Sequence, residues 1–312
     1  MLKQLVGLFR HGGLAGLALC CSLAAAPLAR AQDAAALRAR HATLHDALAA
    51  NAFQRPLVIE SSEPAGGLQG DVYARIEQPF AVVGQALRNS DHWCDILMLH
   101  LNVKQCRARD TPPSASLGLI IGSKYDQPLA NAYRFEFAYQ VVATRPDYLQ
   151  VVLSADQGPL GTSHYRIVLE VVALDAGVSF LHMSYAYDYG VVARVAMEGY
   201  LATIGRSKVG FSVVGYKSDG QPQYIGSMRG VVERNTMRYY LAIEAYLGAL
   251  SLPLAQQFER RLTDWFAGIE RYPTQLHELE LGEYLALKRE QMQRQPARGQ
   301  GALPIETLLE LT

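Results

Sequence analysis

The sequence lacks the short motifs that mark many enzymes and metalloproteins. It contains none of the strings G-x-S-x-G, G-x-x-x-x-G-K-[ST] or G-x-G-x-x-G, which excludes the nucleophile turn of serine hydrolases and the usual glycine-rich phosphate loops. The zinc-protease motif H-E-x-x-H begins at His277 and fails at Leu281, and another candidate histidine, His41, precedes Ala42 instead of glutamate. We therefore expect no metal, no cofactor and no assignable catalytic residue.

The chain also has no excess of positive or negative charge. The 312 residues carry 29 Lys and Arg against 29 Asp and Glu, and no long run of basic residues occurs. Basic patches are typical of proteins that bind nucleic acids or anionic lipid surfaces. The composition therefore favours neither kind of partner.

Only one long apolar run is present, from Leu14 to Ala26, and Lys3 and Arg10 precede it. The run is shorter than the roughly 20 apolar residues that a membrane-spanning helix needs. Ala29-Arg30-Ala31 then supplies small residues at the positions that signal peptidases recognise. We predict that residues 1–31 form a signal peptide cleaved after Ala31, so that the protein is periplasmic or otherwise exported; an uncleaved anchor is the alternative.

Cysteine is scarce, with 4 residues in the chain. Cys20 and Cys21 lie in the apolar run and leave a lipoprotein signal open, although Leu19 stands where such signals carry a small residue. Cys94 and Cys106 form an even pair in an exported protein, and we predict a disulfide between them that contributes roughly 3 kcal/mol to stability. Two buried free thiols or a redox site are the alternatives, but the spacing is not C-x-x-C.

Polar and apolar residues alternate through the middle of the chain. The clearest case is the segment 131–142, in which Phe135 and Phe137 fall on one side and Arg134 and Glu136 on the other. A period of two indicates antiparallel strands with one face exposed to water. Comparable patterns predict strands at 56–60, 71–77, 99–107, 117–125, 149–153, 165–171 and 181–187.

Four polar residues on these strands are expected to point away from the inward apolar rows. His182 interrupts one strand and is interpreted as a packing histidine rather than a general base. His164, Arg166 and Glu170 share the outward side of another strand. We expect these three side chains on a solvated surface.

Helical spacing of apolar residues predicts helices on both sides of the strand-rich region. Before and within it we expect a helix in the segment 32–55, a helix beginning at Pro79 and a short helix capped by Asp91. After it the pattern predicts, in order, a helix over 191–203, a hairpin of 209–214 with 223–225, a long helix over 227–250, helices from Pro253 and from Pro273 to about Arg294, and a flexible tail over 296–312.

This order of elements resembles the helix-grip superfamily, which includes the START lipid-transfer domains and the polyketide cyclases. The resemblance implies an α+β fold in which a curved antiparallel sheet wraps around a long C-terminal helix, with extra helices at both ends. The helix-grip domain is expected over 56–250 and the C-terminal helices over 251–295. The additions at 191–225 and 252–295 depart from the family pattern.

The resemblance also implies a cavity between the sheet and the long helix, lined by the inward side chains. The predicted ligand-binding residues are Phe135, Phe137, Tyr139, Val151, Leu153, Ile167, Leu169, Met183, Tyr185, Tyr187, Tyr239 and Ile243. Tyrosine suits such a wall, because its apolar ring carries a polar tip that can meet a ligand hydroxyl or carboxylate. The alternative is that these side chains fill a solid core.

We predict periplasmic binding or transfer of a hydrophobic small molecule or lipid, without a nucleic acid partner and without a membrane-spanning segment after signal cleavage. A cyclase- or hydrolase-like enzyme is the first alternative, and it requires buried ionisable groups inside the same cavity. An envelope interaction protein is the second alternative, with a partner docked on an exposed apolar face of the helices at 252–295. The missing catalytic motifs favour binding and leave the enzyme question open.

Overall fold

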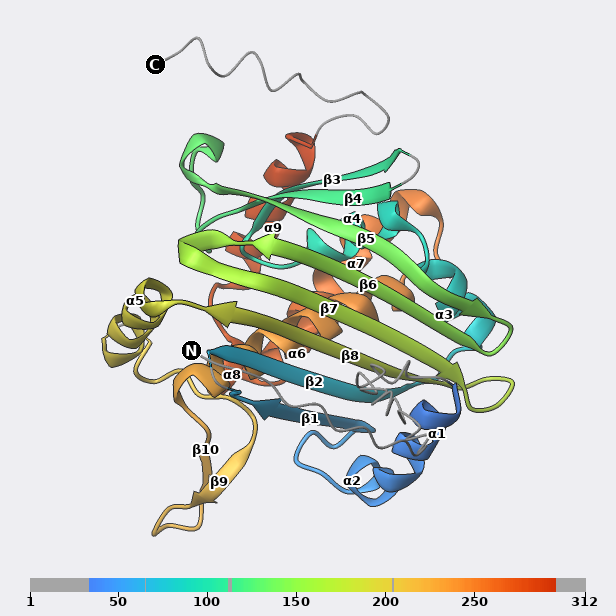
Figure 1. Cartoon of the computed structure of the whole chain (residues 1–312), viewed down its shortest axis with the longest axis horizontal. Coiled ribbons are helices and arrows are strands. Elements are labelled where there is room, and N and C mark those ends of the chain that lie inside the picture. The colour runs from blue at the N-terminus through green and yellow to red at the C-terminus, as the bar shows by residue number, and fades with distance from the viewer. Residues whose placement is uncertain (1–33, 65, 112–113, 204, 296–312) are drawn as a thin grey trace, which may run out of the picture. The chain divides into compact units, whose positions relative to one another are not determined.

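The computed structural model of the chain describes residues 34–64, 66–111, 114–203 and 205–295. The predicted signal peptide at 1–31 and the predicted tail at 296–312 lie outside these residues. Among the described helices, none is both long enough and apolar enough to cross a membrane. The described chain folds into one large antiparallel sheet, a separate two-stranded hairpin, and helices that pack on both faces of the large sheet (Figure 1).

The large sheet has 8 strands in the order β1-β2-β8-β7-β6-β5-β4-β3. The strands are β1 Leu57–Ser62, β2 Gly67–Ile76, β3 Val103–Thr111, β4 Ser114–Ile121, β5 Tyr133–Arg145, β6 Tyr148–Gln157, β7 Thr162–Ala173 and β8 Ser179–Tyr189. Strands β3 to β8 form the predicted meander, and β2 closes it by pairing with β8. The edge strand predicted at 56–60 is confirmed as β1.

The long helix α6, Ser227–Gly248, lies against the inner face of the sheet at β1, β2 and β8 (Figure 1). Val232, Met237 and Ile243 of this helix have no exposed surface. The approach of α6 to β2 is close because Gly70 has no side chain, and a Cβ atom there would collide with the Thr236 hydroxyl. The predicted α+β architecture, a curved antiparallel sheet around a long C-terminal helix, is confirmed.

Five further helices complete the layer around α6. They are α3 Phe80–Leu87, α4 Ser90–Leu97, α7 Leu254–Glu270, α8 Pro273–Leu276 and α9 Leu281–Gln293. Helices α4, α7 and α8 contact α6 directly, whereas α3 packs on β6, β7 and α4. Helix α7 packs along α6, and α9 contacts α7 and β3. The apolar faces of α7 and α9 point inward, with Leu262, Trp265 and Tyr284 almost fully buried.

The single helix predicted from Pro273 to about Arg294 is wrong, because the chain leaves the helical conformation at His277. Glu278 follows and forms buried ion pairs with Arg238 (2.9 Å) and Lys124 (2.6 Å). Glu280 then begins α9 through reciprocal capping with Glu283. The predicted helix is therefore interrupted between Leu276 and Leu281, and Glu278 in this interruption forms ion pairs.

The outer face of the sheet is only partly exposed, because α1 Ala34–Thr43 and α2 His45–Ala49 cover it. Leu37 of α1 packs with Tyr73, Val172 and Phe180, which all point outward from the strands. The prediction that Glu170 lies on a solvated surface is therefore wrong, and its exposure is 0%. His164 and Arg166, farther along the same strand, are exposed as predicted.

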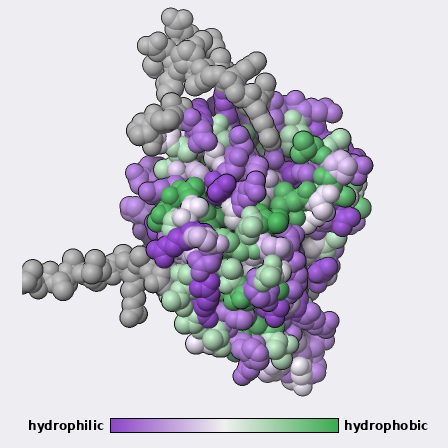
Figure 2. All heavy atoms as spheres, turned by 90° about the vertical axis from the view of Figure 1, so that its right-hand side faces the viewer, coloured by the Kyte–Doolittle hydropathy of each residue, from purple (hydrophilic) through white to green (hydrophobic). Residues whose placement is uncertain are grey.

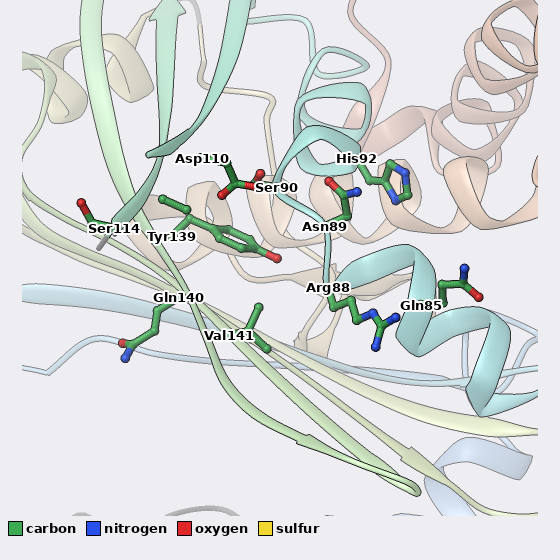
Figure 3. Close-up of a pocket in the computed structure, with 11 residues that line it drawn as sticks. Gln85, Arg88, Asn89, Ser90, His92, Asp110, Ser114, Tyr139, Gln140 and Val141 are labelled. Atoms are coloured by element: carbon green, nitrogen blue, oxygen red, sulfur yellow. The ribbon is translucent and has the colours of Figure 1, made fainter. Parts of the chain in front are cut away.

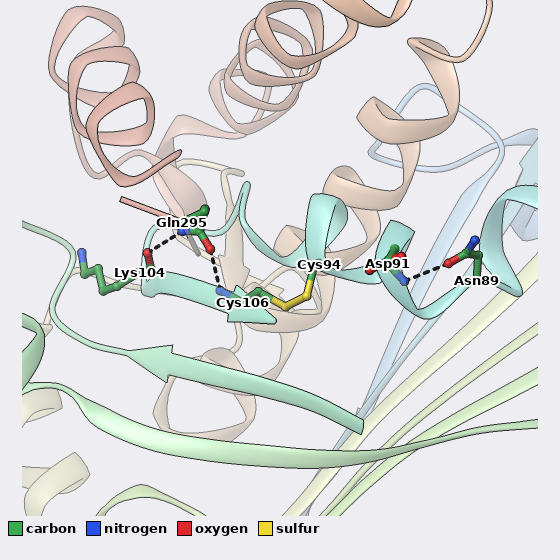
Figure 4. Close-up of a disulfide and its surroundings, with 6 residues drawn as sticks. All are labelled: Asn89, Asp91, Cys94, Lys104, Cys106 and Gln295. Atoms are coloured by element: carbon green, nitrogen blue, oxygen red, sulfur yellow. Dashed lines mark hydrogen bonds between the residues drawn. A yellow bond between two sulfur atoms is a disulfide. The ribbon is translucent and has the colours of Figure 1, made fainter. Parts of the chain in front are cut away.

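The predicted disulfide is confirmed, with Cys94 of α4 bonded to Cys106 of β3 (Figure 4). It joins a helix of the covering layer to the edge strand of the sheet. The predicted cap of α4 is wrong by two residues: the Asn89 side chain accepts the Asp91 N–H (2.9 Å), so Asn89 is the cap. On the other side of β3, the Gln295 side chain accepts the Cys106 N–H (3.1 Å).

Between β8 and α6 the chain forms α5 Val191–Ala202 and a hairpin of β9 Val213–Tyr216 with β10 Pro222–Tyr224. The first hairpin strand begins later than predicted, because the N–H groups of Phe211 and Ser212 donate to the Glu233 carboxylate instead of to a strand. Figure 2 shows the side of the molecule that lies on the right in Figure 1. On this side, small groups of hydrophobic residues lie among hydrophilic ones.

Candidate functional site

A pocket of about 330 Å³ opens between strands β7 and β8, helix α5 and the first half of α6. We call it the tyrosine pocket. Its wall consists of Pro159, Leu160, Thr162, Tyr165, Tyr185, Tyr187, Tyr189, Ala193, Ala196, Met197, Met228, Val231 and Asn235. Among these described wall residues there is no carboxylate, imidazole, ammonium or guanidinium group.

Each wall of the tyrosine pocket follows from a local periodicity. Tyr185, Tyr187 and Tyr189 alternate along β8 and therefore point to the same side of the sheet. Ala193 and Met197 are four residues apart on α5 and share its inner face. Small alanine and flexible methionine side chains leave room between α5 and the tyrosine rings.

The tyrosine rings contact one another across the strands. The rings of Tyr165 and Tyr187 are stacked with centroids 5.1 Å apart, and Tyr185 lies 5.5 Å from Tyr187. Tyr239 of α6 extends the group inward, with its ring 5.4 Å from that of Tyr185. The result is an aromatic wall that runs from the pocket toward the centre of the domain.

The hydroxyl groups of these tyrosines differ in their partners. Tyr165 donates to Thr162 Oγ1 (2.8 Å) and Tyr189 donates to Glu63 Oε1 (2.7 Å). The hydroxyls of Tyr185 and Tyr187 form no hydrogen bond within the described part of the chain. Burial raises the pKa of both, so they stay protonated and can donate a hydrogen bond to a ligand.

The predicted ligand-binding residues lie in four different places in the structure. Tyr185 and Tyr187 line the tyrosine pocket. Tyr139 lines a different pocket beside α4, and the Tyr239 ring is stacked on that of His100 and tilted against that of Tyr185. The other predicted residues are buried in the main core: Phe135, Phe137, Val151, Leu153, Ile167, Leu169, Met183 and Ile243.

The α5 and α6 walls of the tyrosine pocket were not identified from the sequence. On α6, Met228, Val231 and Asn235 recur at intervals of three and four residues, which is the spacing of one helical face. This helical spacing is visible in the sequence, but the alternation along the strands identified side chains of the sheet only. Leu160 at the rim has a positive φ of 58°, which no apolar pattern reveals.

The segment between α5 and α6 is anchored by Glu233, whose exposure is 0%. Its carboxylate accepts hydrogen bonds from the hydroxyls of Ser61 and Ser212 (2.6 Å each) and from the backbone N–H groups of Phe211 (2.6 Å) and Ser212 (2.9 Å). Four donors satisfy a buried carboxylate, so this group holds the base of the hairpin rather than a ligand.

A second buried polar group lies on the opposite face of the sheet from the tyrosine pocket. His182 Nδ1 is 2.9 Å from Glu170 Oε2, and its Nε2 is 2.9 Å from Asp71 Oδ1. The Tyr73 ring stacks on the imidazole with centroids 4.4 Å apart. Helix α1 covers this side, so the interpretation of His182 as a packing histidine stays the simplest one.

Across the described ranges, no group of three or more His, Cys, Asp and Glu side chains is arranged to hold a metal ion. His41 contacts the edge of the Phe180 ring (4.8 Å), and His45 pairs with its neighbour Asp46 (3.0 Å).

Comparison with known proteins gives similarity at the level of the fold. No protein-family model matches the chain, and no curated protein matches its sequence. Among solved structures, the lipid transfer and protein localization domain of human StarD13 is similar over 46% of this chain and 76% of that domain (11% identity, TM-score 0.33). A START superfamily protein from Mycobacterium smegmatis is similar over 48% of this chain and 88% of that chain (14% identity, TM-score 0.29). Norcoclaurine synthase from Thalictrum flavum is similar over 48% and 84% of the two chains (12% identity, TM-score 0.31).

These similarities are weak, and the fold assignment rests on the strand order of the sheet and on the position of α6. The chain has a helix-grip fold. Relative to the helix-grip pattern, α5 and its hairpin are an addition between the last strand and the closing helix. Because α5 supplies one wall of the tyrosine pocket, this addition helps to form the candidate site.

Proposed function

We propose that the protein binds an uncharged hydrophobic small molecule or lipid in the tyrosine pocket and that it acts in the periplasm. The observation that carries the proposal is the chemistry of the pocket wall. Aromatic, alkyl and thioether groups surround the Tyr185 and Tyr187 hydroxyls, which have no partner among the described residues. Such a wall favours an apolar body with one hydrogen-bonding group.

The energy of binding comes mainly from removing apolar ligand surface from water. Each 100 Å² of buried apolar surface contributes roughly 2.5 kcal/mol. A charged ligand is disfavoured because the wall residues offer no countercharge, and an unpaired charge in an apolar pocket is costly. The Tyr185 and Tyr187 hydroxyls then orient the ligand by hydrogen bonding.

The structure offers less support for the two alternatives. An enzyme in this pocket needs ionisable groups that meet inside it, and the only ionisable groups on the described wall are tyrosines. A partner-binding protein needs an exposed apolar face on α7 to α9. The large hydrophobic side chains exposed on the described part of these helices are Leu254 and Leu281, at the start of α7 and α9.

The first experiment looks for the ligand directly. Protein purified from the periplasm of its own organism is analysed by native mass spectrometry, and its organic extract is analysed for lipids. We expect a bound mass that disappears on denaturation. Protein that carries no bound molecule in this preparation would contradict the proposal.

The second experiment fills the pocket by mutation. Ala193 on the inner face of α5 is 8% exposed, whereas Val195 on the same helix is 62% exposed. Ala193→Trp is expected to weaken binding of the uncharged dye Nile red by about tenfold or more, because the indole occupies the ligand volume. Val195→Trp is the matched control and should bind the dye like the wild type; equal effects of both substitutions would place the dye elsewhere.

The location is tested separately. N-terminal sequencing of protein from the periplasmic fraction is expected to begin at Gln32, immediately after Ala31. Recovery of the intact chain, beginning at Met1, in the cytoplasmic fraction alone would contradict export.

A further inference from the structure

A second and larger pocket, of about 830 Å³, lies on another part of the fold. One wall is the connection between α3 and α4, and the other is formed by β3, β4 and β5 (Figure 3). We call it the α4 pocket. It shares no lining residue with the tyrosine pocket, and the function proposed above makes no use of it.

The first turn of α4 forms part of this pocket, at Ser90 and His92. Backbone N–H groups in the first turn of a helix have no partner inside the helix. Together with the helix dipole they favour a negatively charged group at this end. Asn89 satisfies one of these groups by accepting the Asp91 N–H (2.9 Å), and its side-chain amide also lines the pocket.

Tyr139 supplies an independent indication of a ligand. Its side chain lies across the pocket with the hydroxyl directed toward the α3–α4 side, where Arg88 and Asn89 lie (Figure 3). The residue is only 8% exposed, and no described group accepts its hydroxyl proton; the nearby Trp93 indole N–H is a donor and is already bonded to the Leu87 carbonyl (2.8 Å). A buried hydroxyl without a partner is destabilising, so a ligand atom that accepts its proton would be favoured here. Burial, with the nearby Asp110 charge, raises the pKa of Tyr139 and keeps it a donor.

The charged groups of the pocket indicate what kind of anion fits. Arg88 is exposed at the rim and forms no ion pair with any described residue. Asp110 lines the opposite wall, and Asp91 lies in the first turn of α4. These two carboxylates oppose a dianion more than a monoanion, because the repulsion grows with ligand charge. The Tyr139 ring, Ala115 and Val141 add apolar surface beside the polar groups.

We propose that the α4 pocket binds a small organic monocarboxylate. Its carboxylate lies between the first turn of α4, the Arg88 guanidinium and the Tyr139 hydroxyl. Its apolar body lies on the Tyr139 ring and Val141. Ser90 and Asn89 supply further hydrogen-bond donors to the carboxylate.

The test uses the mature chain and three probes that each carry a phenyl ring. They are 4-phenylbutyrate, the uncharged 4-phenylbutanol, and phenyl phosphate, which is a dianion at pH 8. Isothermal titration calorimetry gives the affinities, and amide shifts in NMR spectra locate the site. We expect 4-phenylbutyrate to shift the amides of Asn89, Ser90 and His92 and to bind about tenfold more tightly than either of the other probes.

Two substitutions and one matched control connect the affinity to the named groups. Arg88→Gln and Tyr139→Phe are each expected to weaken 4-phenylbutyrate binding about fivefold or more, because each removes one donor to the carboxylate. Arg166→Gln removes another exposed arginine, on β7, that forms no ion pair with a described residue, and it should leave the affinity unchanged. Tyr139→Phe should also keep or raise the melting temperature, because the lost hydroxyl has no protein partner.

Several results would overturn the proposal. These are the absence of 4-phenylbutyrate binding at about 10 mM, equal affinity for the alcohol, tighter binding of phenyl phosphate, or an unchanged affinity in Arg88→Gln. A large loss of stability in Tyr139→Phe would show that the hydroxyl serves the fold instead. None of these outcomes bears on the tyrosine pocket, because Ala193→Trp and Nile red test that site independently.

Discussion

At the scale of single residues, the buried polar side chains affect the stability of the fold more than the exposed ones. His182 lies between the carboxylates of Asp71 and Glu170, and Tyr148 donates a hydrogen bond to Glu170. Burial lowers the pKa of His182, but the hydrogen bonds and charges of the two carboxylates outweigh it, so the pKa lies above the ordinary value of 6.5. The protonated imidazole therefore stabilises the fold.

We expect this contribution to depend on pH in a defined direction. Because the folded-state pKa is raised, the stabilisation is fully present below pH 6.5 and is lost as the pH rises through the folded-state value. His182→Gln should lower the free energy of unfolding by about 3–5 kcal/mol at pH 6, since it removes the positive charge that lies between the two carboxylates. The loss should be smaller at pH 9, where the wild-type imidazole is also neutral. Urea unfolding of both proteins at the two pH values measures this difference, and a loss independent of pH would contradict it.

The residue scale also shows a limit of sequence reasoning. Alternation along β7 correctly placed Glu170 on the outer side of its strand, but it could not show that α1 covers that side. Burial of Glu170 depends on a segment more than one hundred residues away in sequence. The same holds for Tyr185 and Tyr187, whose side of the strand was predicted while the space in front of them was not.

At the scale of elements, the disulfide between α4 and β3 is the strongest local constraint that the sequence indicated. The two cysteines are 12 residues apart, and the loop between them turns from the covering helices into the edge strand of the sheet. The cross-link restricts the unfolded chain, which is one physical source of its effect on stability.

We expect the double substitution Cys94→Ser and Cys106→Ser to lower the free energy of unfolding by roughly 3 kcal/mol. Urea unfolding followed by circular dichroism provides the measurement. Wild-type protein in excess reductant is the control and should lose a similar amount. An unchanged midpoint in both cases would mean that the disulfide does not hold α4 on β3.

Element boundaries were predicted best where one periodicity runs without interruption. The long helix was expected at 227–250 and spans Ser227–Gly248, and the row from Phe135 to Tyr139 lies in β5 as expected. Boundaries were predicted wrongly where a backbone N–H group donates to a side chain instead of to a neighbouring strand or helix turn. Glu233 at the hairpin and Asn89 before α4 are such cases.

At the scale of the whole domain, the helix-grip sheet is covered on both faces. The main core lies between the sheet and α6, and a smaller core lies between the sheet and α1. The α1 helix is also held by its charged residues, because Arg38 pairs with Asp147 (2.6 Å) and Arg40 pairs with Glu60 (2.5 Å). These pairs are exposed, so the apolar contacts of Leu37 carry most of the energy.

We expect Leu37→Asp to expose the outer apolar face of the sheet. Leu37 is 4% exposed, and placing a carboxylate there should lower the free energy of unfolding by roughly 3 kcal/mol and increase binding of the dye anilinonaphthalene sulfonate. Ala35→Asp, at an exposed position of the same helix, is the control and should change neither property. Thermal unfolding and dye fluorescence measure the two effects, and equal behaviour of the two variants would show that α1 does not seal this face.

The sequence alone determined the order of the strands, the inward rows, the closing helix and the cysteine pair, because these depend on periodicity and spacing within short segments. The tertiary structure decided which inward side chains face open space, that α5 forms a wall of the tyrosine pocket, and that Glu170 and His182 are buried together. It also brought Arg88 and Tyr139 to one pocket. Cavities and burial arise from contacts between segments far apart in the chain, and no local pattern encodes where such segments leave a gap.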